Sequence, residues 1–173
     1  MTLPGARRRP AERPSFAAAA EAHLDDVYGY LVYLTRDGVL AEDLAGETFE
    51  KALRIWDRFD PRRGSPRTWL LGIARTTALD WFRAEARRRR REESAAVREV
   101  AETSFPEGLS PALETALASL SAGEREVVAL RVLLDLDGES AARVLGISAT
   151  ACSTRLSRAL AKLEEKVRND ALV

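Results

Sequence analysis

The sequence predicts an all-α fold of two small helical domains joined by a flexible linker. Apolar residues recur at helical spacing over most of the chain, no segment alternates as a strand does, and an acidic, Pro- and Gly-containing stretch divides the chain after its middle. With 173 residues, 46% of them hydrophobic, the chain has room for two small domains. We expect a disordered tail over 1–15, a first domain over 16–92, a linker over 93–110 and a second domain over 111–170.

The first domain is expected to hold three helices, over about 16–35, 41–58 and 67–91. The second of them is amphipathic, with apolar residues on one side, namely Ala41, Ala45, Phe49, Ala52 and Trp56. Its opposite side carries the mostly acidic stripe Asp43, Glu47, Glu50 and Arg54. Such a stripe often serves solubility alone, so these residues by themselves leave its role open.

The third helix and the loop before it, residues 59–66, are rich in arginine. Residues 61–92 contain ten arginines against three acidic residues, although the whole chain has a net charge of zero. An outward ridge is expected at Thr76, Asp80, Arg83 and Arg87. Arginines of this density can neutralise phosphates, and the boundary aromatics Trp69 and Phe82 could stack on unpaired bases. The alternative is a solvated basic surface without a partner.

The second domain is expected to be helical over about 112–167, with a helix-turn-helix over 138–163. Gly146 can supply the positive φ that ends the first helix, and Ser148 can cap the second. On the second helix the apolar side is Cys152, Leu156, Ala159, Leu160 and Leu163, and the outward side is Thr150, Thr154, Ser157 and Arg158. This spacing favours a DNA reader, and an ordinary helical hairpin is the alternative.

Several classes of protein are not expected. The chain has no run of about 20 apolar residues and no signal peptide, which predicts a cytoplasmic protein. A single cysteine, Cys152, and a single histidine, His23, give no internal disulfide and no zinc cluster. Because no nucleophile–base pair and no phosphate-binding loop can be assembled, we expect no enzyme, no catalytic residue and no cofactor.

Two segments carry a resemblance to a known family. Residues 41–83, AEDLAGETFEKALRIWDRFDPRRGSPRTWLLGIARTTALDWFR, resemble conserved region 2 of bacterial RNA polymerase sigma factors. Residues 120–163, LSAGEREVVALRVLLDLDGESAARVLGISATACSTRLSRALAKL, resemble their region 4. Two domains with no middle domain resemble the extracytoplasmic-function (ECF) group. The resemblance implies a protein that binds core RNA polymerase and directs it to promoters.

The resemblance also implies roles for particular residues. The polymerase clamp helices would be contacted by Asp43, Leu44, Glu47, Phe49 and Glu50. The melted non-template strand of the minus-10 element would be held by Arg62, Arg63, Ser65, Trp69, Thr76, Asp80, Arg83 and Arg87. The duplex minus-35 element would be read by Ser148, Thr150, Ser153, Thr154, Arg155 and Arg158. An anti-sigma factor is a further implied partner, and phosphodiester chemistry would belong to the polymerase.

Departures from the family pattern modify these expectations. Gly46 replaces a common glutamine beside the docking glutamate, and Pro66 and Thr76 replace a common aromatic and asparagine, so the minus-10 preference is expected to be unusual. Ser153 and Ser157 make the recognition helix less basic, so we expect it to depend on tethering by polymerase. Two alternatives remain: a free-standing helix-turn-helix regulator, and a protein-binding adaptor derived from a sigma factor.

Overall fold

The computed structural model describes residues 13–92 and 111–170, and every regular element within them is helical. The N-terminal block consists of α1 (Phe16–Thr35), α2 (Gly38–Arg54), the 3-10 turn η1 (Trp56–Arg58) and α3 (Pro66–Glu92). The C-terminal block consists of α4 (Pro111–Ala118), α5 (Ala122–Val128), the π-helical turn η2 (Ala129–Leu133), α6 (Gly138–Leu145) and α7 (Ala149–Asp170). The predicted all-α class is confirmed. The predicted linker and all but the last three residues of the predicted tail lie outside the described residues.

Local capping explains where the first two helices begin. The Ser15 side chain accepts a hydrogen bond from the Ala18 N–H at 3.2 Å, so α1 spans the residues that the sequence predicts. Asp37 accepts one from the Leu40 N–H at 3.0 Å and thereby starts α2 three residues before the predicted position. The same helix ends at Arg54, earlier than predicted, because the chain tightens into η1.

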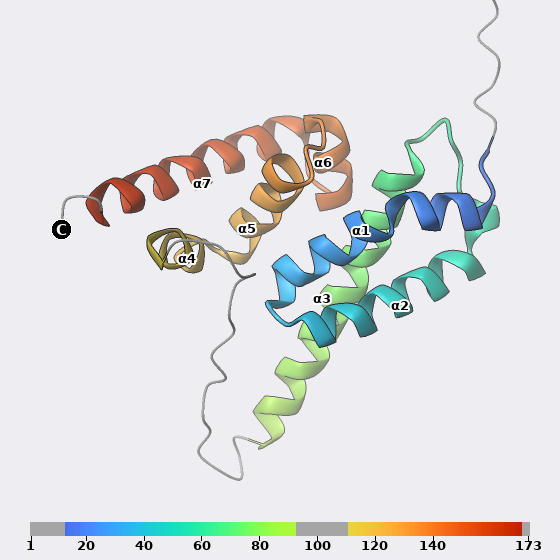
Figure 1. Cartoon of the computed structure of the whole chain (residues 1–173), viewed down its shortest axis with the longest axis horizontal. Coiled ribbons are helices and arrows are strands. Elements are labelled where there is room, and N and C mark those ends of the chain that lie inside the picture. Colours follow the sequence, from blue (N-terminus) through green and yellow to red (C-terminus); the bar gives the residue numbers. More distant parts are fainter. Residues whose placement is uncertain (1–12, 93–110, 171–173) are drawn as a thin grey trace, which may run out of the picture.

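The N-terminal block packs its three helices around a dense core (Figure 1). The buried positions of α2 include Ala41, Ala45 and Ala52, whose small side chains let α1 and α3 approach closely. The larger core residues come from the other two helices and are fully buried, namely Val27, Tyr30 and Leu31 of α1 and Leu70 and Leu71 of α3. The outer half of α3 extends past the bundle into solvent (Figure 1).

The C-terminal block contains the predicted helix-turn-helix. Gly146 ends α6 with a φ of 67°, and Ser148 accepts a hydrogen bond from the Ala151 N–H at 3.1 Å at the start of α7. Cys152 and Ala159 of α7 are buried as predicted, whereas Leu160 is 44% exposed. At 100° per residue Leu160 lies about 80° around the helix from Cys152, at the edge of the apolar face, so the prediction that it is buried is wrong.

The two blocks also pack against each other. Helix α3 contacts α6, α1 contacts η2, and buried residues of both blocks form one continuous cluster. The acidic stripe of α2 and the predicted α3 ridge remain exposed in this arrangement. Among the described residues, no helix is both long enough and apolar enough to cross a bilayer.

Candidate functional site

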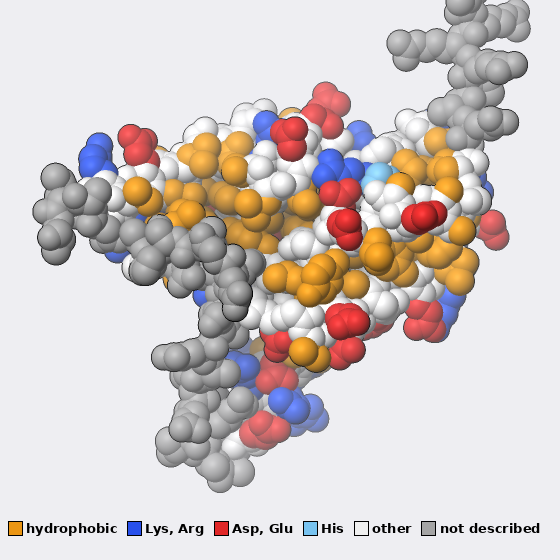
Figure 2. Space-filling view, in the orientation of Figure 1, with side chains coloured by type: hydrophobic (Ala, Val, Ile, Leu, Met, Phe, Trp, Pro, Cys, Tyr) orange, Lys and Arg blue, Asp and Glu red, His pale blue; other side chains and the backbone are white. Residues whose placement is uncertain are grey.

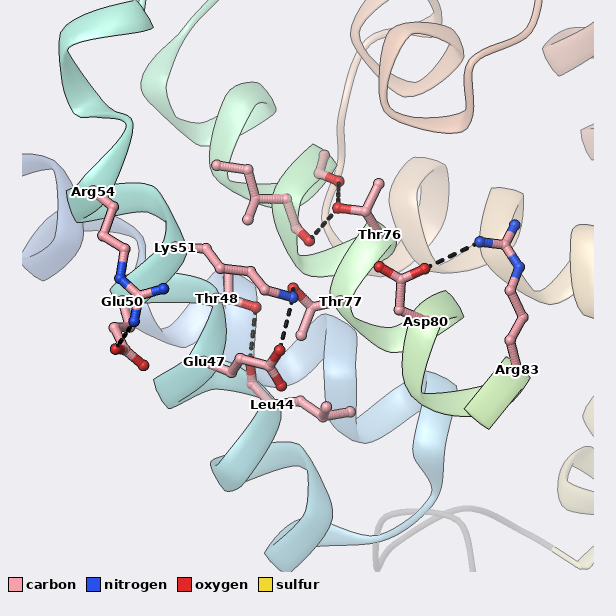
Figure 3. A network of polar contacts seen from close by, with 12 residues as sticks. Leu44, Glu47, Thr48, Glu50, Lys51, Arg54, Thr76, Thr77, Asp80 and Arg83 are labelled. Atoms are coloured by element: carbon pink, nitrogen blue, oxygen red, sulfur yellow. Dashed lines mark hydrogen bonds and ion pairs between the residues drawn. The ribbon is translucent and has the colours of Figure 1, made fainter. Parts of the chain in front are cut away.

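The acidic stripe of α2 lies on the surface beside α3 (Figure 3). Glu47 pairs with Lys51 at 2.7 Å, and Lys51 also donates a hydrogen bond to the Thr77 hydroxyl at 3.3 Å. Glu50 pairs with Arg54 one turn further along. Exposed i,i+4 pairs of this kind contribute only about 0.3–0.5 kcal/mol each, so the carboxylates remain available to a basic partner.

Two apolar residues predicted to contact polymerase have different positions. Leu44 is 2% exposed and packs in the core, so the prediction that it touches a partner is wrong; it holds the stripe in place instead. Phe49 is half-buried and lines a groove of about 480 Å³ between α1 and α2. Leu24 and Tyr28, which are 51% and 40% exposed, line the same groove, and no other atom lies within 4 Å of a Cβ placed on Gly46.

Figure 2 shows apolar side chains gathered over α1 and α2, with acidic side chains at their edges. An apolar groove with an acidic rim suits a helix that carries both apolar and basic side chains. The predicted docking residues other than Leu44 lie on or beside this surface.

A second hollow, of about 530 Å³, lies between the loop after η1 and the first half of α3; we call it the loop pocket. Its lining includes Arg63, Ser65, Trp69 and Thr76, which the sequence predicts as minus-10 contacts. Ser65 also caps α3, because its hydroxyl accepts a hydrogen bond from the Thr68 N–H at 3.1 Å. The structure therefore brings these four predicted residues together.

An aromatic cluster fixes the shape of the loop. Trp56 stacks on Phe59 with ring centroids 4.9 Å apart, and Trp69 meets Trp56 edge-on at 5.4 Å. Arg13 adds a cation–π contact, with its guanidinium carbon 5.3 Å from the Trp56 ring centroid. Because Phe59 is 4% exposed and Trp69 half-buried, Trp69 is the aromatic residue of this group that lines the pocket and can stack on a base.

The remaining predicted minus-10 residues lie outside the loop pocket. Arg62 is exposed on the far side of the loop, and Asp80, Arg83 and Arg87 are exposed along the outer half of α3. Asp80 and Arg83 form an ion pair at 3.1 Å (Figure 3). Phe82, considered as a base contact, instead packs edge-on against Trp81 with ring centroids 5.3 Å apart.

The predicted minus-35 residues gather at the start of α7. A hollow of about 550 Å³ is lined by Ser148, Thr150, Thr154, Arg155 and Arg158, together with Ser121 and Glu124 of the preceding turn and helix. Arg155 lies over Gly123, where a Cβ would stand 3.1 Å from its Nη1 atom. Ser153 is exposed beside this hollow and does not line it.

Charge balance in this region is set by Glu124. The Lys162 ammonium, 2.6 Å from its carboxylate, and the Ser121 backbone N–H lower the pKa of Glu124 from 4.5 to about 2. The carboxylate is therefore ionised at neutral pH and occupied by its own block, which leaves Arg155 and Arg158 as the cationic groups of the hollow.

Sequence reasoning missed several residues of the loop pocket. Arg58 and Thr68 are close to the predicted loop and could have been found by extending it, since both line the hollow. Arg143 and Val144 of α6 also line it, although they are about 70 positions away in the sequence. No local pattern indicates that contact, because it depends on how the two blocks pack.

Comparisons with known proteins agree with this arrangement. The family model described as Sigma-70 region 2 matches residues 19–88, and the one described as Sigma-70, region 4 matches residues 110–163. The ECF sigma factor SigC of Mycobacterium tuberculosis is 34% identical over 82% of this chain and 77% of its own length. The sigma factor CarQ of Myxococcus xanthus is 32% identical over 92% of each chain.

Another relative and two solved structures extend the comparison. The ECF sigma factor BldN of Streptomyces coelicolor is 32% identical over 95% of this chain, which spans only 65% of BldN. The sigma factor RpoE, solved with the anti-sigma factor NepR from Bartonella quintana, superposes with a TM-score of 0.74 at 25% identity over 88% of this chain and 96% of its own. CnrH, solved with the cytosolic domain of CnrY, gives 0.66 at 26% identity over 90% and 88%.

Proposed function

Since the chain belongs to the ECF sigma factors, with regions 2 and 4 in order, we propose that it binds core RNA polymerase and directs promoter-specific initiation. One observation carries the proposal: three chemically different surfaces, an acidic stripe, an arginine-lined aromatic pocket and a helix-turn-helix, are assembled on one chain. The chain would act in the cytoplasm on polymerase and promoter DNA. It would perform no catalytic step.

We assign polymerase docking to the exposed stripe of α2 and the adjoining groove. Asp43, Glu47 and Glu50 supply the charge, and Phe49 supplies apolar surface. A partner helix with basic side chains would displace the weak pairs with Lys51 and Arg54 at little cost.

We assign capture of the melted minus-10 strand to the loop pocket and the α3 ridge. Trp69 offers a stacking face, Thr76 and Ser65 offer hydroxyls, and Arg63 offers a cation for a phosphate. A base that leaves the duplex would exchange its stacking on neighbouring bases for contacts in the pocket, which offsets part of the melting free energy.

We assign the duplex minus-35 element to the exposed start of α7. Thr150, Thr154, Arg155 and Arg158 face one hollow and can contact base edges and phosphates together. Two chains similar to this one were solved with an anti-sigma factor or with the cytosolic domain of CnrY, so we also propose regulation by a protein inhibitor.

Reconstituted transcription tests the function. Purified chain and core polymerase, given a genomic fragment library, should yield run-off transcripts from a limited set of start sites. Specific binding of the isolated chain to duplex DNA without polymerase would favour the free-standing regulator, and polymerase binding without any transcript would favour the adaptor.

A charge-reversal pair tests the docking surface. Asp43→Arg with Glu47→Arg should abolish polymerase binding in a pull-down, because two exposed carboxylates become cations, while circular dichroism stays helical. The matched control is Glu164→Arg with Glu165→Arg, an equal charge change at exposed positions of α7. Unaltered binding by the first pair would remove the docking assignment.

A further inference from the structure

The contact between the two blocks contains a largely buried ion pair. Arg75 of α3 and Glu126 of α5 form two parallel hydrogen bonds, with Nε 3.0 Å from Oε1 and Nη2 3.2 Å from Oε2. Glu126 is 6% exposed. A two-pronged pair in such surroundings is directional, so it forms only when the two helices keep one relative position.

A second arginine of α3 joins both blocks. Arg67 donates hydrogen bonds at 2.7 Å to both carboxylate oxygens of Asp26 in α1 and, through Nη2, at 2.7 Å to the Leu134 carbonyl after η2. Asp26 therefore orients the guanidinium toward the C-terminal block. We refer to Arg67 and Arg75 with these partners as the latch.

With the latch closed, α6 forms one wall of the loop pocket. Arg143 reaches the loop so closely that a Cβ on Gly64 would stand 2.8 Å from its Nη1 atom, and Val144 lines the pocket beside it. A DNA strand that entered between the loop and α3 would meet α6 on this side.

Electrostatics at the pocket oppose this closure. Within the part of the chain that the structure describes, Arg58, Arg63 and Arg143 line one hollow and none forms an ion pair with a carboxylate. Like charges at close range repel, and phosphates would relieve that repulsion. Closure must therefore be held elsewhere, and the latch is the polar contact placed to do so.

We propose that the free chain masks its own DNA pocket: the latch holds the C-terminal block against α3, so that α6 obstructs the pocket until the blocks separate. This inference rests on the function proposed above, since it concerns the same pocket. The docking stripe stays exposed in the closed form, so polymerase can bind first and DNA capture would follow opening.

Charge variants of the full-length chain test the latch. Arg75→Glu places two carboxylates together and should open the chain, whereas Arg75→Glu with Glu126→Arg restores the pair in reverse. Arg75→Gln is the milder alternative should Arg75→Glu not fold. Arg168→Glu, at an exposed position near the end of α7, is the matched control for charge.

Two readouts are needed for each variant. Small-angle scattering should give a larger radius of gyration for Arg75→Glu and Arg75→Gln, and a compact value for the wild type, the swapped pair and Arg168→Glu. If closure leaves about one molecule in ten open, the opened variants should bind a fluorescent mixed-sequence single-stranded 12-mer about tenfold more tightly. Both opening variants lose positive charge, so simple electrostatics would weaken their DNA binding instead.

The outcomes separate this proposal from the proposed function. A compact Arg75→Gln chain, or an expanded one that binds the 12-mer no more tightly, overturns self-masking even when run-off transcription succeeds. Expanded variants with tighter binding support self-masking. Absence of transcription from every chain, with polymerase present, would count against the proposed function while the scattering result still decides closure.

Discussion

The Tyr30 hydroxyl is buried at the centre of the molecule and has no hydrogen-bond partner among the described residues. Burial, followed by the nearby charge of Glu126, raises the pKa of this phenol far above its usual value, so it stays neutral. A buried hydroxyl that forms no hydrogen bond destabilises the fold by its lost hydration.

We therefore expect Tyr30→Phe to raise the free energy of unfolding by about 1 kcal/mol, because the ring keeps its packing and the unsatisfied oxygen is removed. Urea denaturation followed by circular dichroism measures this. Tyr28→Phe, at a position 40% exposed, is the matched control and should change little. A destabilised Tyr30→Phe chain would show that the hydroxyl has a partner in solution.

Glu124 links the start of α5 to α7 and makes stability depend on pH. Its side chain accepts a hydrogen bond from the Ser121 N–H at 2.9 Å, completing a capping box, and an ion pair with Lys162 joins it to α7. Because its pKa falls from 4.5 unfolded to about 2 folded, this stabilisation is fully present above pH 4.5. It is lost as the pH falls from 4.5 towards 2.

We expect Glu124→Gln to lower the free energy of unfolding by about 1 kcal/mol at pH 7, discounted for the half-exposed Lys162, and to leave it unchanged near pH 2. Glutamine can still accept the capping hydrogen bond, so the difference reports the charge. Glu139→Gln, at an exposed position of α6, is the control. A difference that persists at pH 2 would exclude the charge as its cause.

Among the helices, α7 is the one whose two sides have clearly separate tasks. Arg155 and Arg158 lie in the hollow predicted to face the minus-35 element, while Cys152 and Ala159 hold the helix in its block. We expect Arg155→Ala to weaken protection of the minus-35 element by holoenzyme more than protection of the melted minus-10 element. Footprinting with polymerase measures both, Arg168→Ala is the control, and equal loss at the two elements would contradict the assignment.

Helix positions were predictable where a local signal exists. Ser15, Gly146 and Ser148 act within three or four residues of themselves, so α1 and the helix-turn-helix follow from the sequence. The acidic stripe follows from the 3.6-residue period, which also places Ala41 and Ala45 inside. Leu44 was assigned to the surface by resemblance, although it lies in the core of this chain.

Contacts between distant segments were not predictable in the same way. Arg67 and Arg75 look like members of one basic run, and nothing near them indicates that one meets the Leu134 carbonyl and the other Glu126. The wall that α6 gives the loop pocket has the same origin. Charge composition shows that a run can bind anions, but only the packed structure shows which cations already have partners.

The packing of the blocks also determines how the whole chain unfolds. Each block alone is in the size range where a single core is marginal, and the buried cluster runs through both. Loss of one partner from a buried ion pair costs about 3–5 kcal/mol, so Arg75–Glu126 couples the two blocks strongly. We expect the wild-type chain to melt in one calorimetric transition, with equal calorimetric and van't Hoff enthalpies.

Arg75→Glu should split this transition into two, because each block then unfolds without the other, and the reversed pair with Glu126→Arg should restore one. Differential scanning calorimetry at neutral pH makes the comparison, with Arg168→Glu as the control for charge. Two transitions in the wild type would mean that the blocks are energetically independent. The ion pair would then be too weak to couple them, whatever its geometry.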